Sequence, residues 1–157
     1  MEATAYHEAG HALIATLLGG RVKSVTITPD DDDGPRRFGD TQVHWRRSVS
    51  ERDLHEHGIR VALAGPVAEM LYSGDPFHPG LVAEWASDWQ AAWELAEPFF
   101  PDHRKRLAYL EEVTCQLHRQ LDAEPHWSAV AALADHLLAH ETLELEEVRE
   151  IVGEWLG

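Results

Sequence analysis

The chain has 157 residues, of which 44% are hydrophobic and 26% charged, a balance typical of a globular protein. Its 28 Asp and Glu residues outnumber its 13 Lys and Arg residues, which gives a formal net charge of -15. Nucleic acids and anionic membranes are therefore disfavoured as partners, because both bind to basic patches.

The length predicts a single domain over residues 1–157. No apolar run approaches the ~20 residues that a membrane helix needs, so we expect no membrane segment. Cys115 is the only cysteine, which excludes an internal disulfide. We expect a cytoplasmic protein with this cysteine in its core.

Hydrophobic periodicity predicts a first helix over residues 3–18, which ends at a pair of glycines. Apolar and polar residues then alternate, which predicts two strands at 22–28 and 41–45. The polar, turn-rich segment between them indicates a hairpin with a long tip.

Ser50 is placed to cap the next helix, because an acidic residue follows it three positions later. We expect this helix to run to about Ala64 and to be interrupted at Gly65-Pro66 before a further helical stretch to about Leu71.

The second half of the chain reads as helical, with Asp102 and Pro125 as typical helix-start residues. We expect helices at 81–97, from Asp102 to about Leu121, from Pro125 to about Glu141, and at roughly 144–155. The predicted fold class is therefore mainly α (α+β), with one small β-hairpin or sheet.

The first helix carries the sequence His7-Glu8-Ala9-Gly10-His11, an HExxH motif. Residues four apart lie on one face of a helix, so both imidazoles can reach one Zn²⁺. Glu8 lies close enough to accept a proton from a water at the metal. The glycine within the motif costs about 0.8–1.0 kcal/mol relative to alanine, which a close approach to another backbone would explain.

Two histidines leave a zinc site one protein ligand short. The extended motif with a third histidine is absent, since residues 14 and 17 are Ile and Leu. The third ligand must therefore come from another part of the chain, and the residue types left open are His, Asp and Glu.

Five segments of the chain resemble, in the same order, the peptidase domain of FtsH-type AAA+ metalloproteases. They are TAYHEAGHAL (4–13), VKSVTITP (22–29), ALAGPVAEMLYSG (62–74), ASDWQAAWELA (86–96) and LADHLLAHETLELEEVREIV (133–152). The resemblance implies a helical zinc-peptidase domain, with Asp88 as the third zinc ligand. It also places Glu69 where it would orient a ligating histidine from outside the metal's own ligands.

The chain departs from the family pattern at Ser87, Pro66 and Met70, which stand where the family has Asn, Arg and Glu. No Walker A sequence occurs, and only six residues precede His7. We therefore expect a stand-alone, ATP-independent zinc endopeptidase that cuts peptides or loosely folded proteins and pairs them with the strand near 22–28. The alternative is a non-catalytic, zinc-stabilised adaptor, and homo-oligomers are left open.

Other patterns are given structural interpretations. His136 and His140 lack an intervening Glu, and Asp30 to Asp33 miss the spacing of an EF-hand, so neither predicts a second metal site. A tryptophan recurs every four residues at positions 85, 89 and 93, which favours a packed helix face over a protein-binding surface.

Overall fold

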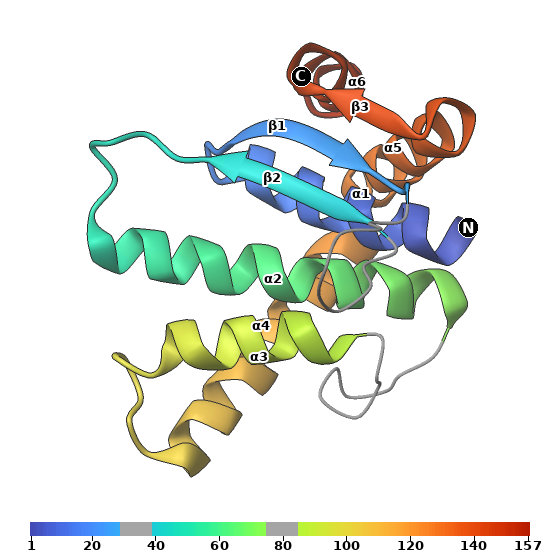
Figure 1. Cartoon of the computed structure of the whole chain (residues 1–157). Coiled ribbons are helices and arrows are strands. Elements are labelled where there is room, and N and C mark those ends of the chain that lie inside the picture. The colour runs from blue at the N-terminus through green and yellow to red at the C-terminus, as the bar shows by residue number, and fades with distance from the viewer. Residues whose placement is uncertain (29–38, 75–84) are drawn as a thin grey trace.

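The computed structural model describes residues 1–28, 39–74 and 85–157 (Figure 1). These residues form α1 (Glu2–Leu17), β1 (Arg21–Thr26), β2 (Asp40–His44), α2 (Glu51–Ser73), α3 (Ala86–Ala96), α4 (His103–Asp122), α5 (His126–His140), β3 (Thr142–Glu144) and α6 (Leu145–Leu156). The mainly helical fold class with one small sheet is confirmed. No helix within the described ranges is both long and apolar enough to cross a membrane.

The sheet is antiparallel with the strand order β2-β1-β3, so β1 lies in the middle (Figure 1). The predicted hairpin is confirmed as the pair β1 and β2. The expectation that the strand near 22–28 pairs with substrate is wrong, because β2 and β3 already occupy both edges of β1 from Ser24 to Thr26. The three residues of β3 were not predicted as a strand, since so short a segment shows no usable alternation.

Helix α1 is the centre of the fold, with the sheet and α5 packed against it and α2 alongside (Figure 1). Every residue from Glu8 to Ala15 is buried. A helix surrounded in this way needs small or apolar residues on several faces, and the alanines of HEAGHALIA supply them. Helices α3 and α4 pack on α2.

Gly10 marks the closest approach of α1 to α2. A methyl group built on Gly10 would lie 2.5 Å from the backbone oxygen of Ala64 and 2.6 Å from the Cβ atom of Ala68. These distances are shorter than real contacts allow, so the expected close approach to another backbone is confirmed.

Helix α2 runs without a break through Gly65 and Pro66, so the predicted interruption is wrong. The proline cannot donate a hydrogen bond within the helix. Both residues are buried against the rest of the fold, and tertiary packing of this kind outweighs local helix propensity. The predicted cap is confirmed, because Ser50 Oγ accepts a 3.1 Å hydrogen bond from the Asp53 amide.

In the second half of the chain, Asp102 caps α4 by accepting a 3.0 Å hydrogen bond from the Lys105 amide. Cys115, expected in the core, is exposed on α4. Trp85 is buried, and the other two tryptophans of the four-residue repeat pack against the core, which confirms the packed face. The predicted helical residues 81–84 lie outside the described ranges.

The contact at Gly10 generates a stability prediction. Gly10→Ala should lower the free energy of unfolding by about 1–3 kcal/mol, because overpacking against the Ala64 carbonyl outweighs the gain in helix propensity. Urea unfolding followed by circular dichroism measures the change.

The matched control is Gly153→Ala in α6, where an added methyl group meets nothing within 4 Å. This variant should be neutral or more stable by up to about 1 kcal/mol. Equal effects of the two substitutions would show that the α1–α2 approach does not constrain position 10.

Candidate metal centre

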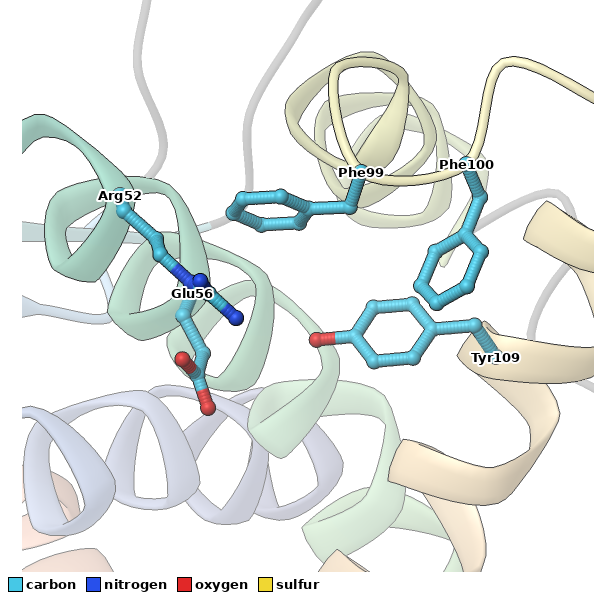
Figure 2. A pocket seen from close by; sticks show the side chains of 5 residues that line it. All are labelled: Arg52, Glu56, Phe99, Phe100 and Tyr109. Carbon is cyan, nitrogen blue, oxygen red and sulfur yellow. The ribbon is translucent and has the colours of Figure 1, made fainter.

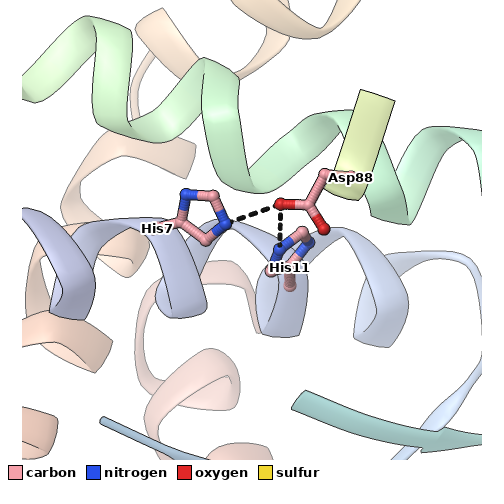
Figure 3. Close-up of side chains that lie close together, drawn as sticks. All are labelled: His7, His11 and Asp88. Carbon is pink, nitrogen blue, oxygen red and sulfur yellow. Dashed lines mark hydrogen bonds and ion pairs between the residues drawn. The ribbon is translucent and has the colours of Figure 1, made fainter. Parts of the chain in front are cut away.

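Three side chains from two helices meet beside α1 (Figure 3). His7 and His11 project from α1, and Asp88 comes from the first turn of α3. Asp88 Oδ2 lies 2.7 Å from His7 Nε2 and 3.3 Å from His11 Nε2. One potential ligand atom from each residue lies within 4.8 Å of the others. The structure therefore brings together the three residues for which the sequence suggested zinc ligation.

The second nitrogen of each imidazole is held by α2. His7 Nδ1 lies 3.0 Å from Glu69 Oε1, and His11 Nδ1 lies 2.6 Å from the backbone oxygen of Val61. A carbonyl oxygen can only accept a hydrogen bond, so His11 Nδ1 carries a proton. In the neutral ring the lone pair then lies on Nε2, which points to the meeting point with Asp88. Glu69 thus contacts His7, and its role in orienting a zinc-ligating histidine stays a prediction.

Gly65 makes room for the ring of His11. A methyl group at this position would lie 2.3 Å from His11 Nε2 and 2.5 Å from Cε1. The glycine that was expected to break α2 instead allows the imidazole to lie against the helix backbone. A larger residue here would force the His11 ring or the helix backbone to shift.

The two histidines and Asp88 shift one another's pKa values. Burial would lower the pKa of His7, but its hydrogen bonds to Asp88 and then to Glu69 outweigh burial and raise the pKa to about 10. Burial opposes protonation of His11 as well, and Asp88 nevertheless raises its pKa. Burial would raise the pKa of Asp88, while His11 and His7 hold it well below its usual range. The acidic side chains of the cluster thus favour positive charge on the two histidines.

Glu8 lies on α1 between the two histidines in sequence and is 5% exposed. Thr41 of β2 donates a 2.7 Å hydrogen bond to Glu8 Oε1. Gly39, just before β2, lies so close that a methyl group there would be 2.8 Å from Glu8 Cγ. Sequence reasoning missed both contacts. The available signal was the strand alternation, which placed a polar threonine on the inward face of β2.

Other sequence features do not add a second metal site among the described residues. His136 and His140 are both exposed, with ring centroids 6.0 Å apart, and no third ligand from the described ranges joins them. His78, one of the histidines that the open choice of third ligand allows, and the acidic run at 30–33 lie outside those ranges.

A hollow of about 390 Å³ lies at the opposite end of α2 from Glu69 (Figure 2). Its lining combines a cation, an acid and three aromatic rings: Arg52, Glu56, Phe99, Phe100 and Tyr109. The guanidinium of Arg52 sits 6.0 Å from the Phe99 ring centroid, and the Phe100 and Tyr109 rings are 4.7 Å apart. These side chains can contact a ligand, but they do not form a group of three possible metal ligands like that beside α1.

The electrostatics of the cluster predict a pH dependence for the metal-free protein. Because the pKa of His7 is raised in the folded protein, its protonated form stabilises the fold. This contribution is complete when the pH is below 6.5, the ordinary pKa of histidine, and is lost as the pH rises to about 10. The lowered pKa of Asp88 contributes stability above its ordinary value of 3.8, which is lost as the pH falls. Stability should therefore peak between about pH 4 and 6.5.

Urea unfolding in the presence of a chelator, repeated from pH 4 to 10, measures this profile. His7→Gln should reduce the alkaline decline, because it removes the group whose pKa is raised most clearly. A metal-free protein that became more stable from pH 6.5 to 9 would contradict the assigned charge interactions.

Comparison with known proteins places this site in a family context. A profile of the family described as Peptidase M50B-like matches residues 1–68, which include the HExxH motif. An ATP-dependent zinc metalloprotease FtsH from Opitutus terrae is 30% identical over 96% of this chain. An ATP-dependent zinc metalloprotease FtsH 1 from Rhodopirellula baltica is 45% identical over 45% of this chain.

The chain spans 28% of the Opitutus protein, and its match to the Rhodopirellula protein covers 10% of that protein. The first of these matches extends over nearly all 157 residues, and both are to zinc metalloproteases of the same name. The resemblance seen in the sequence is thereby confirmed. The chain is a homologue of the peptidase region of FtsH-type zinc metalloproteases.

Proposed function

We propose that this chain is a single zinc-dependent endopeptidase domain that hydrolyses peptide bonds in peptides and loosely folded proteins. The observation that carries this function is the buried carboxylate of Glu8 next in sequence to His7, in a helix where His7 and His11 converge on Asp88. Similarity to zinc metalloproteases over 96% of the chain supports it.

The donor set fits a catalytic zinc ion. His7 and His11 would bind through Nε2 and Asp88 through its carboxylate, which leaves a fourth tetrahedral position open. Glu69 and the Val61 carbonyl hold the two Nδ1 atoms and thereby orient both rings. When bound, zinc polarises a peptide carbonyl and makes a neighbouring water more acidic.

Glu8 is the general base of the proposed reaction. Its carboxylate accepts a proton from the attacking water while the water oxygen bonds to the peptide carbonyl carbon. The same carboxyl group then returns the proton to the amide nitrogen as the C–N bond breaks. The products are a carboxylic acid and an amine, and Glu8 is regenerated.

An extended substrate would pair with β2, because β2 is one of the two outer strands of the order β2-β1-β3 and carries the residue that contacts Glu8. Its outer edge presents backbone groups that can form a ladder with an added strand. Thr41 connects this strand to Glu8, so a peptide on β2 would lie near the general base.

Hydrolysis by these residues is proposed to need no nucleotide, because the metal ligands, the general base and water supply every group that the reaction uses. A peptidase that acts without nucleotide reaches only segments that are already extended or that open transiently, which favours peptides and loosely folded proteins as substrates. The exposed, unpaired Cys115 suits a reducing compartment, and we propose a cytoplasmic location.

The second candidate is a zinc-stabilised adaptor that cuts nothing. The aromatic hollow of Figure 2 favours it, because such a hollow can hold a side chain of a partner. The Glu8 substitution below separates the two functions.

Glu8→Gln should keep zinc and lower peptide hydrolysis by at least about 10²-fold, because glutamine preserves the size of the side chain and removes the base. Cleavage of a quenched fluorescent peptide, with and without chelator, measures the loss. Glu51→Gln at the exposed start of α2 is the matched control and should keep full activity. Chelator-sensitive activity that survives in Glu8→Gln would rule out the assigned base, and a wild-type protein that binds zinc without cutting would favour the adaptor.

Substitutions of Asp88 and Glu69 should lower the zinc affinity to different extents. Asp88→Ala should weaken zinc binding strongly, whereas Glu69→Ala should weaken it by about 10–100-fold, the usual effect of losing a partner of a ligating histidine. Competition against a chelating dye measures both affinities, with Glu94→Ala on exposed α3 surface as the control. Zinc affinity in Asp88→Ala within about threefold of wild type would exclude Asp88 as a ligand.

A further inference from the structure

The buried carboxylate of Glu8 is held by a hydrogen bond from the neighbouring strand β2. Within the described ranges, the single hydrogen bond to its carboxylate comes from Thr41 Oγ1, at 2.7 Å from Oε1. A carboxylate that is 5% exposed loses most of its contact with water, so each remaining donor determines its orientation.

Thr41 is placed for this contact by the register of the sheet. It pairs with Val25, whose side chain is buried, while the next residue, Gln42, is exposed. Successive residues of a strand face opposite sides, so Thr41 points towards α1. Its branched side chain is stiff at χ1, which limits the directions in which the hydroxyl can point.

The residue before β2 is also fitted to Glu8. A methyl group at Gly39 would lie 2.8 Å from Glu8 Cγ and 3.0 Å from the backbone oxygen of Thr26. The backbone at the start of β2 is thus in close contact with the side chain of Glu8. The contacts of Gly39 and Thr41 with Glu8 thus both come from the start of β2.

We propose that Thr41 is a positioning residue, whose hydroxyl fixes the orientation in which Glu8 takes the proton from the attacking water. The inference rests on the proposed peptidase function. The Thr41 hydroxyl donates its hydrogen bond to Oε1 of Glu8. The other carboxylate oxygen, Oε2, then accepts the proton from water. Substrate pairing and orientation of the base then depend on one strand, because β2 is also the outer strand with which we propose that substrate pairs.

Thr41→Val tests the role, since valine keeps the shape and the strand propensity and removes the hydroxyl. With a quenched fluorescent peptide, kcat should fall about 10- to 100-fold, as expected for a lost hydrogen bond to a charged group. KM should stay within about twofold, because the base is engaged in the chemical step and contributes little to ground-state binding. Thr41→Ser keeps the hydroxyl and should restore kcat to within about threefold of wild type.

The matched control is Thr142→Val in β3, which removes a hydroxyl from the opposite side of the sheet, where it contacts Thr26. It should leave kcat unchanged. A Thr41→Val enzyme with wild-type kcat, or a Thr41→Ser enzyme as slow as Thr41→Val, would overturn the positioning role.

Crystal structures of the zinc-loaded wild type and Thr41→Val provide a readout besides activity. The carboxylate of Glu8 should change its rotamer or lose a single orientation in the variant. An unchanged Glu8 would overturn the inference whether or not the protein cuts peptides. Absence of chelator-sensitive cleavage in the wild type would count against the peptidase function alone, and the orientation of Glu8 would then decide the role of Thr41.

Discussion

The close approach of α1 and α2 is the constraint on which the rest of the site depends. Gly10 lets α1 lie directly against the backbone of Ala64, and Gly65 lets the ring of His11 lie against α2. At this separation the Val61 carbonyl and the Glu69 carboxylate reach the Nδ1 atoms of the two histidines. The HExxH spacing puts the imidazoles on one face, but α2 fixes how they are turned.

The cluster also illustrates how buried charge can be arranged for a metal. Asp88 and Glu69 both contact His7, and their hydrogen bonds outweigh the cost of burying its positive charge. A proton on His7 balances these acids when no metal is bound, and its pKa is raised accordingly. A divalent cation would replace the proton as the positive charge beside these carboxylates. Metal binding therefore requires the loss of protons from the histidines and becomes more favourable as the pH rises.

Much of the fold could be predicted because its signals are local. The periodicity of α1, the alternation in β1 and β2, and the caps at Ser50 and Asp102 each lie within a few residues. The prediction failed at Gly65-Pro66 because burial between helices outweighs local propensity there.

The candidate site divides in the same way. The His7, Glu8 and His11 pattern is local, and its own spacing indicates its chemistry. Asp88 is 77 residues beyond His11 in the sequence and came from the resemblance, since spacing alone left the third ligand open. Thr41 could not be assigned, because strand alternation shows which way a side chain faces but not which helix residue it meets.

The proposed chemistry depends on one zinc ion that His7, His11 and Asp88 hold together beside Glu8. Crystals grown with zinc and measured on both sides of the zinc absorption edge test it most directly. If these three residues hold zinc, the crystals should give one strong anomalous peak with both Nε2 atoms at about 2.0–2.1 Å and an Asp88 oxygen at about 2.0–2.2 Å. A peak at these histidines with Asp88 turned away and another residue in its place would contradict this ligand set. The absence of any peak beside the two histidines would contradict it as well.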